Sequence, residues 1–222
     1  DSSSVGNTNM LSDYAAIKNG SYGKLMKAYY AKQDAEKLSG KGDTSQKLTL
    51  MKTSADSLKK SADALNDSSL WEKKKIKKKD EKTGEEIAVE DYDWDKITKA
   101  VKSFVEDYND VVREAGESNT KDVLRNASWM TGMTDKNSNM LAKIGITIGK
   151  GNKLELDEDA LKQADISSLK TIFTGYNSFV SKISQKATGI SNAANRASAT
   201  YTNNGTYSKT DSSLTSSKID KE

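Results

Sequence analysis

The sequence predicts a mainly α-helical protein, built as an elongated antiparallel helical bundle or coiled coil with two short β-hairpins. Apolar residues recur at steps of three and four along several long segments, which is the spacing of one helix face. Only 34% of the 222 residues are apolar while 30% are charged, a balance that suits a thin, extended core. Two short segments instead alternate apolar and polar residues around glycine, as the strands of tight hairpins do.

The composition argues against several classes of function. Histidine, cysteine and proline are absent, so the commonest general base, the thiolate nucleophile and the strongest transition-metal ligands are missing. We therefore expect no enzyme, no cofactor and no metal. The net charge of +3 comes from interleaved acids and bases, and no apolar run reaches the length of a membrane span. Neither a nucleic-acid partner nor a membrane is expected.

The chain divides into three parts by composition. Residues 1–9 are small and polar and are predicted to be a disordered segment. Residues 10–208 carry the helical spacing and form the predicted elongated domain, with early helical segments broken at Gly20 and Gly23. Residues 209–222 are rich in serine and threonine and are predicted to be a flexible tail.

The first long helix is predicted over residues 44–66. Asp43, followed three residues later by Gln46, resembles a capping box at its start. The apolar positions fit either a coiled-coil seam or an ordinary amphipathic surface helix, and the pattern is too short to decide between them. These positions are Leu48, Met51, Ala55, Leu58, Ala62 and Leu65.

A lysine/glutamate hairpin is predicted over about residues 72–93. Six lysines fall within residues 73–79, and acidic residues follow after Thr83-Gly84. With Thr83-Gly84 as the tip, Lys77 would lie opposite Glu90 and Lys74 opposite Asp93. Ile76, Ile87 and Val89 would then share one face. The alternative interpretation of the lysines is a phosphate-binding patch, but no aromatic residues are interleaved with them.

The second long helix is predicted from Asp93 to about Glu117 and should pack antiparallel to residues 44–66. Its apolar stripe consists of Ile97, Val101, Phe104, Val105, Tyr108, Val111 and Val112. A shorter helix should follow, with Val123, Leu124 and Trp129 partly buried, and then another that ends at Gly145.

The second hairpin belongs to a small subdomain over about residues 141–175. Ile146 and Ile148 form one alternating strand, Leu154 and Leu156 form the other, and the segment GKGN between them tolerates positive φ. Asp157 should then cap a short helix. Three consecutive acids begin there, but adjacent side chains do not converge as calcium ligands do.

The last long helix follows a short one, ISSLKTIFTG, that should end at Gly175. Its apolar positions are Val180, Ile183, Ala187, Ile190, Ala194, Ala197 and Tyr201. Gly189 within this helix indicates either a tight helix contact or a local bend. The segment TNNGTY after it predicts an Asn-Gly turn.

Four segments, taken in order, resemble a known family. They are VKSFVEDYNDVV, LAKIGITIGKGNKLELDEDAL, SLKTIFTG and YTNNGTYSK. Their order and spacing are similar to the C-terminal part of the filament-capping protein of the bacterial flagellum, the hook-associated protein 2 family. The resemblance covers a little under half of the chain.

The resemblance implies a structural protein of the flagellar filament. A member would be exported by the flagellar type III apparatus, act outside the cell at the filament tip, form homo-oligomers and assist the assembly of its partner, flagellin. It implies fold-bearing roles rather than catalysis. Phe104, Val105, Tyr108 and Asn109 would lie in the helix beside the small hairpin; Gly145, Leu154, Leu156 and Asp157 would shape that hairpin; and Phe173, with Gly175 after it, would close its core.

The chain departs from the family pattern in two ways. The N-terminal signature and terminal coiled coil are not seen, and the lysine/glutamate hairpin stands where the family has a large head domain. Either flanking helices were cut away or this is a reduced relative with another assembly role. Two other hypotheses are a coiled-coil surface adhesin or secretion-tip protein, and a nucleic-acid binder acting through Lys73 to Lys79.

Overall fold

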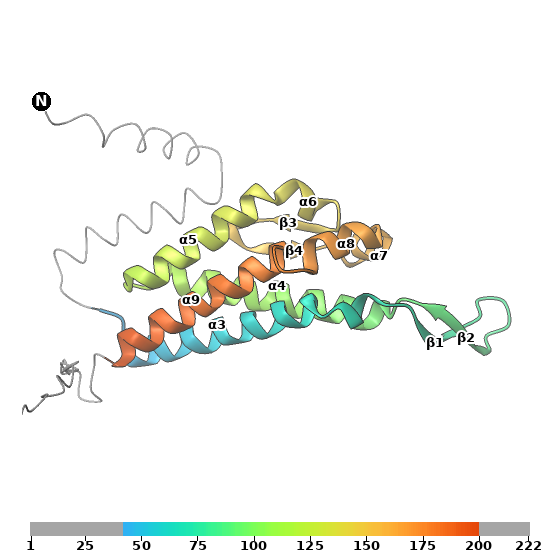
Figure 1. The fold of residues 1–222 in the computed structure, drawn as a ribbon, viewed down its shortest axis with the longest axis horizontal. Helices are drawn as coiled ribbons and strands as arrows, with labels where there is room; N and C mark the ends of the chain where they lie inside the picture. Colours follow the sequence, from blue (N-terminus) through green and yellow to red (C-terminus); the bar gives the residue numbers. More distant parts are fainter. Residues whose placement is uncertain (1–41, 200–222) are drawn as a thin grey trace, which may run out of the picture.

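Long helices lying side by side form the body of the protein in the computed structural model, which describes residues 42–199 (Figure 1). The described residues form mainly α-helices with two short antiparallel strand pairs, so the predicted fold class is confirmed. The elements are α3 (Ser45–Asn66), η1 (Ser68–Trp71), β1 (Lys74–Lys79), β2 (Glu86–Asp91), α4 (Trp94–Gly116), α5 (Lys121–Lys136), α6 (Ser138–Ala142), β3 (Ile146–Ile148), η2 (Lys150–Asn152), β4 (Leu154–Leu156), α7 (Glu158–Gln163), α8 (Ile166–Phe173) and α9 (Phe179–Ala199).

Several predictions fall outside these residues. They are the segment 1–9, the early helical segments around Gly20 and Gly23, the position Tyr201 with the Asn-Gly turn after it, and the tail 209–222.

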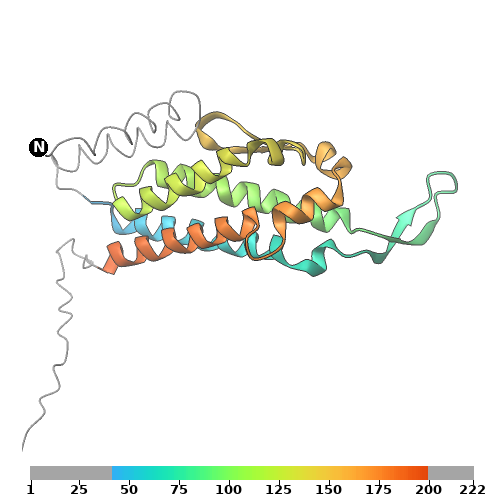
Figure 2. The same ribbon diagram turned by 45° about the horizontal axis from the view of Figure 1, so that its top comes forward.

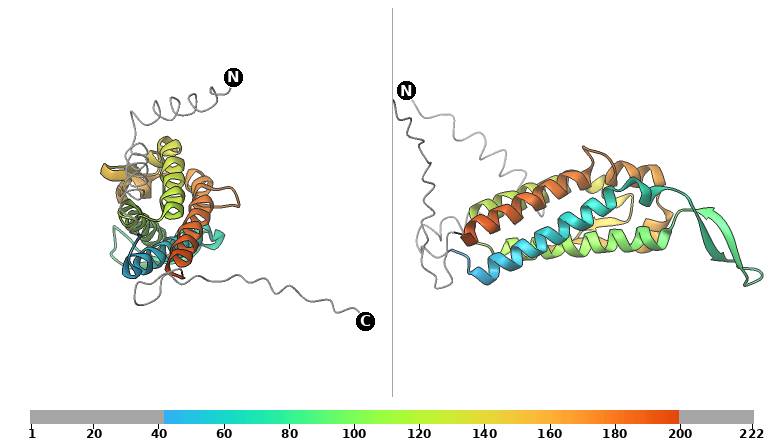
Figure 3. Two further views of the ribbon diagram at one scale, coloured as in Figure 1. Left: turned by 90° about the vertical axis from the view of Figure 1, so that its left-hand side faces the viewer. Right: turned by 60° about the horizontal axis from the view of Figure 1, so that its bottom comes forward.

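The four longer helices α3, α4, α5 and α9 surround one core (Figures 2 and 3). Helix α3 packs along both α9 and α4, and α5 packs on α9. The predicted pairing of α3 with α4 is therefore present, and the longer contact of α3 is with α9. All predicted apolar positions of α3 and α4 are buried, as are Val180, Ile183, Ala187, Ile190 and Ala194 of α9. Local periodicity thus identified the inward faces correctly.

Polar contacts also set the register between α3 and α9. The Ser191 hydroxyl donates to Asp56 Oδ1 at 2.5 Å, and the Ser184 hydroxyl donates to Asp63 Oδ1 at 2.6 Å. The two aspartates and the two serines are each seven residues apart, in opposite directions along the chain. This spacing repeats after two helical turns, so the two bonds fix one antiparallel alignment of the helices.

Gly189 of α9 makes a tight helix contact, one of the two interpretations left open by the sequence. A Cβ atom at this position would lie 2.5 Å from Asn126 Oδ1 on α5. The missing side chain therefore lets α5 approach α9 closely.

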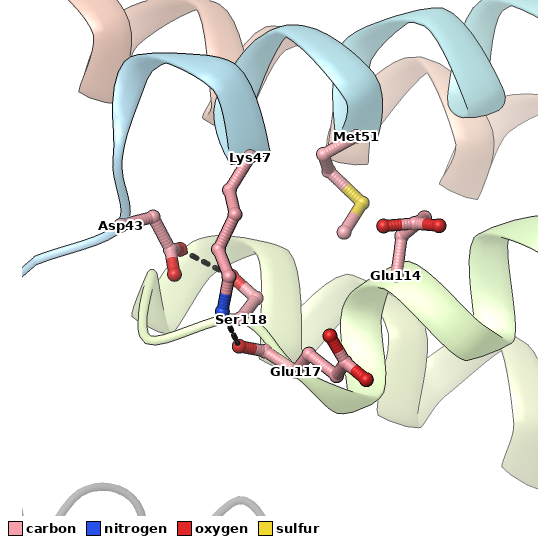
Figure 4. A pocket seen from close by; sticks show the side chains of 6 residues that line it. All are labelled: Asp43, Lys47, Met51, Glu114, Glu117 and Ser118. Atoms are coloured by element: carbon pink, nitrogen blue, oxygen red, sulfur yellow. Dashed lines mark hydrogen bonds between the residues drawn. The ribbon is translucent and has the colours of Figure 1, made fainter.

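The predicted capping box at Asp43 and Gln46 is wrong. Thr44 is the N-cap of α3, and its hydroxyl oxygen accepts a hydrogen bond from the Lys47 backbone N–H at 3.2 Å. The Lys47 amine instead donates to the backbone oxygen of Glu117 at 3.3 Å, at the C-terminal end of α4 (Figure 4). A cation there complements the negative end of the helix dipole.

Asp43 instead binds the turn that precedes α5. Its carboxylate accepts a hydrogen bond from the Ser118 hydroxyl at 2.6 Å (Figure 4). It also accepts from the Asn119 N–H at 2.8 Å and the Thr120 N–H at 3.0 Å. Thr120 is the N-cap of α5 but makes no capping bond with its own side chain. Asp43, only 7% exposed, thus joins the start of α3 to the turn between α4 and α5.

The lysine/glutamate hairpin projects beyond one end of the bundle (Figures 1 and 3). Its register differs from the prediction by two residues: Lys74 lies opposite Asp91 and Lys77 opposite Ala88. Ile76 faces Val89 directly, with Ile87 two residues along, so the predicted shared face is retained. A two-residue slip preserves the side-chain faces because the strand period is two.

The register moves because the turn is centred ahead of Thr83-Gly84. The Asp80 carboxylate accepts hydrogen bonds from the N–H groups of Lys82 at 2.7 Å and Thr83 at 3.0 Å. The Asp80 N–H in turn donates to Glu85 O at 2.9 Å and closes a six-residue turn. An aspartate that bonds its own following backbone sets where the chain reverses.

Trp129 is 63% exposed, so the prediction that it is partly buried is wrong. The buried side of α5 carries Val123, Ala127 and Met130. With 3.6 residues per turn, Trp129 falls on the opposite side. There the Lys186 amine lies 5.3 Å from the centre of the indole ring.

Asp43→Ala should lower the free energy of unfolding by about 2 to 3 kcal/mol. The substitution removes the acceptor of the buried Ser118 hydroxyl and of the Asn119 N–H, in the turn before α5. Chemical denaturation of the full chain measures the effect. The control is Asp135→Ala on the exposed side of α5, expected to change stability by no more than about 0.5 kcal/mol. Equal effects of the two variants would contradict the assignment.

Acid should weaken the α3–α9 contact through Asp56 and Asp63. Partial burial alone would raise the pKa of each carboxyl, but hydrogen bonds from a lysine four residues earlier and from a serine of α9 outweigh it and hold each pKa below its usual value of 3.8. A carboxyl with a lowered pKa in the folded state stabilises the protein above pH 3.8 and loses this contribution as the pH falls through the folded pKa.

The unfolding free energy should therefore decline more steeply below about pH 4 in the natural sequence than in the variant D56N/D63N. Urea titrations across this pH range measure the two slopes. Asp135→Asn is the control for charge removal and should leave the steep decline intact. Parallel curves for the natural sequence and D56N/D63N would show that these carboxyls do not respond to acid as described.

Candidate functional site: the hairpin module on helix α4

Residues 145–175 form a small unit that we call the hairpin module. It contains β3, η2, β4, α7 and α8. It lies against the side of α4 and next to the start of α9 (Figures 1 and 2). Strand β3 pairs antiparallel with β4. Glycine and asparagine in the connecting turn take the left-handed conformation, with φ +69° at Gly151 and +66° at Asn152. The second hairpin therefore forms where the alternating pattern placed it.

Asn109 fastens the hairpin module to α4. Its amide nitrogen donates to Leu154 O at 2.9 Å, and its amide oxygen accepts from the Leu154 N–H at 2.7 Å. One side chain therefore satisfies both backbone groups of a buried residue in β4. An asparagine provides a donor and an acceptor side by side, which is the pair that an exposed strand edge requires.

Gly145 and Asp157 close the base of the hairpin. The Asp157 N–H donates to Gly145 O at 2.8 Å. The Asp157 side chain then accepts from the Ala160 N–H at 2.9 Å and caps α7, as predicted. Gly145 has φ +82°, and a Cβ atom there would lie 2.6 Å from Asp157 O. A side chain at Gly145 is therefore disfavoured by both backbone conformation and space.

An aromatic cluster joins the hairpin module to the bundle. Phe173 of α8 stacks on Trp71 with ring centres 5.5 Å apart and meets Phe104 edge-on at 6.4 Å. Phe104 also contacts Phe179 of α9 at 6.4 Å and Tyr108 at 6.2 Å. All five side chains are buried. Aromatic pairs in these geometries contribute about 0.5 to 1.5 kcal/mol each beyond the area they bury.

The buried side chain of Tyr108 links two helices. Its hydroxyl donates to Thr134 Oγ1 of α5 at 2.9 Å. Complete burial raises the pKa of Tyr108 well above its usual range. The phenol therefore stays protonated, and it connects α4 to α5 instead of exchanging protons with solvent.

The other predicted site residues lie around this joint. Val105 is buried in the core and Leu156 is half-buried in β4. Gly175, with φ +100°, donates its N–H to Asn66 Oδ1 at 2.8 Å, and so ties the end of α8 to the end of α3. Phe173 lies at the boundary with the bundle, where it meets η1 and α4.

Trp71, Phe179 and Asn66 belong to this joint but were not identified from the sequence. Their partners lie far away in the chain, and no local spacing signals such contacts.

The described residues form neither a cluster of metal-ligating side chains nor a membrane-spanning helix. Within 42–199 no three histidine, cysteine, aspartate or glutamate side chains are grouped to bind a metal ion. The pocket between the start of α3 and the end of α4 has a volume of about 10 Å³, room for little more than one water molecule (Figure 4). No helix in the same range is long and apolar enough to cross a membrane.

A comparison with known protein families finds a match for the C-terminal part of the chain. Residues 118–222 match the family model described as flagellar hook-associated protein 2 C-terminus. No curated protein and no solved structure matches the chain. The match includes the hairpin module and the segment 201–209, while VKSFVEDYNDVV in α4 precedes it.

The matched family consists of structural flagellar proteins and is not known for enzymatic activity. Residues 118–222 are a C-terminal region of the flagellar hook-associated protein 2 family, and the resemblance drawn from the sequence is confirmed.

Asn109→Ala should loosen the hairpin module. Removing both partners of the Leu154 backbone should cost about 2 to 3 kcal/mol, because a buried N–H and C=O lose their hydrogen bonds. Amide hydrogen exchange should show faster exchange in β3 and β4 than in the natural sequence. Asn139→Ala, an exposed position of α6, is the matched control and should leave exchange unchanged. Unaltered exchange in Asn109→Ala would contradict the proposed attachment.

Gly145→Ala should destabilise the protein by more than about 3 kcal/mol, since it adds a backbone overlap to an unfavourable φ. Gly151→Ala measures the cost of the positive φ alone, because φ at Gly151 is also positive but a Cβ atom there would meet nothing within 4 Å. Its cost should be about 1 to 2 kcal/mol. Thermal unfolding of both variants provides the comparison, and equal losses would exclude a close approach at Gly145.

Proposed function

We propose that this protein is a structural component related to the flagellar filament cap, which assists flagellin assembly at the filament tip. It would work through helix-mediated self-association and through contacts with flagellin. The observation that carries the proposal is the family match over residues 118–222, a region that includes the whole hairpin module and α9. Under this proposal the protein acts outside the cell, on the flagellum, after export by the flagellar type III apparatus.

The contacts of the hairpin module support a mechanical role. Its polar links each join distant elements: Asn109 joins α4 to β4, and Gly175 joins α8 to α3 through Asn66. Tyr108, one residue before Asn109, joins α4 to α5. Hydrogen bonds of this kind hold the elements in fixed relative positions. A protein that guides the addition of subunits needs such a rigid body, because a flexible one could not hold a partner in a fixed orientation.

The candidate residues have a defined part in this proposal. Phe104, Val105, Tyr108 and Asn109 form the side of α4 that supports the hairpin module, and Phe173 completes the joint. We propose that they keep the orientation of the module on the bundle. We also propose that residues 10–208 form the working domain, with the segments 1–9 and 209–222 outside it.

Deletion of the protein in its source bacterium tests the proposal. Cells without it should carry short or missing filaments and should release flagellin into the medium, both visible by electron microscopy and by immunoblotting of the culture supernatant. Complementation with the natural sequence should restore filaments. Normal filaments and unchanged flagellin release in the deletion strain would overturn the proposal.

Two variants separate the role of the hairpin module from the presence of the protein. Asn109→Ala should complement poorly and Asn139→Ala should complement fully, provided that both are secreted in equal amounts. Equal complementation by the two would mean that the orientation of the module is not needed for assembly.

A further inference from the structure

The hairpin of β1 and β2 has two strand edges that nothing covers within residues 42–199. The two strands form a sheet of their own, and no third strand of the described chain pairs with either. The hairpin extends past the end of the bundle in Figures 1 and 2 and in the right-hand view of Figure 3. An edge strand offers a row of backbone N–H and C=O groups that can pair with another strand.

The two edges carry opposite charge. Strand β1 reads KKIKKK and strand β2 reads EIAVED. Five of the six side chains of β1 are cationic, while three in β2 are anionic and none is cationic. The charges are exposed or partly exposed, including those of the ion pairs Lys77–Glu86 and Lys78–Asp91 within the hairpin.

We propose that β1 of one copy pairs with β2 of a second copy, so that hairpins from successive copies join into one antiparallel sheet. Pairing β1 with β1 would set lysine against lysine, and pairing β2 with β2 would set acid against acid. Like charges on facing strands repel one another. Only the β1–β2 combination places each lysine strand between two acidic strands, so the charge pattern selects the second copy and its orientation.

The backbone pattern shows which groups would make this contact. The Asp80 N–H donates to Glu85 O, so this pair lies in the hydrogen-bonded register of the hairpin. Hydrogen-bonded and open pairs alternate along an antiparallel ladder. The pairs Lys75–Glu90, Lys77–Ala88 and Lys79–Glu86 therefore direct their backbone groups outward. These are the donors and acceptors available to the neighbouring copy.

Lysines at a free edge normally prevent pairing with another chain. Here the edge that would approach is acidic, so the lysines would favour this one partner and exclude the others. The contact would also cover apolar surface, because Ile76 faces Val89, and Ile87, at 41% exposed, lies on the same side. A head-to-tail contact of this kind closes into a ring or continues as an open chain of copies.

The hairpin contact rests on the proposed self-association, because it needs a second copy of the chain. It adds the surface through which the copies would meet, the outer edges of β1 and β2. Proline tests it, because proline lacks the N–H that an outward position supplies. Lys77→Pro blocks the β1 edge and Ala88→Pro blocks the β2 edge, while the inward hydrogen bonds stay possible. Lys77→Arg and Ala88→Ser are the matched controls. Light scattering of the full chain reports the mass of each sample, and circular dichroism reports whether the bundle is folded.

The natural sequence and both controls should form oligomers, and each proline variant alone should have the mass of a single chain. An equal mixture of the two proline variants should form a dimer and nothing larger, because one intact β1 edge meets one intact β2 edge. The mixture keeps the test valid even where a proline weakens its own hairpin. Oligomers that persist in both proline variants would overturn the hairpin contact but leave self-association through the helices. A natural sequence that remains a single chain would overturn both.

Discussion

The packing of α4 is the constraint on which the rest of the structure depends. This helix has a single apolar stripe, but it must cover α3, part of α5 and the hairpin module. Phe104 meets this demand by contacting aromatic rings of α8 and α9, while Asn109, on the border of the stripe, binds the backbone of β4. Within residues 42–199 the buried apolar side chains of the hairpin module belong to the same core cluster as those of the bundle. The module and the bundle therefore share one folding unit.

Features decided by neighbouring residues could be predicted from the sequence. The inward faces of α3, α4 and α9 follow from apolar spacing, because a helix exposes one side to the core wherever it packs. Asp93 and Asp157 were identified as helix starts, since a capping side chain bonds amides only two or three residues away. The β3–β4 hairpin could be predicted for the same reason, because its strands and its turn lie within a few residues of one another.

Features decided by distant contacts could not be predicted. Asp43 has the sequence context of a cap for α3, but its carboxylate meets the start of α5 more than seventy residues later. The partner of Asn109 is a backbone 45 residues away, and nothing around Asn109 distinguishes it from a solvated asparagine. Trp129 was expected to be partly buried, although the helical period places it on the outer side of α5. The lysine hairpin was assigned the correct strands and the wrong register, because the turn was located from Thr83-Gly84 and not from the Asp80 side chain.

A structural role on the flagellum agrees with this architecture, because polar side chains such as Asn109 and Tyr108 hydrogen-bond across to other elements of the fold. Native-state hydrogen exchange of the full chain tests the central claim, that the hairpin module and the bundle are one folding unit held by α4. The slowest amides of β3 and β4 should open with the same free energy as those of α4 and α9, and should shift together with them as denaturant is added. A module whose amides all exchange at a much lower free energy, while α4 and α9 remain protected, would contradict the account.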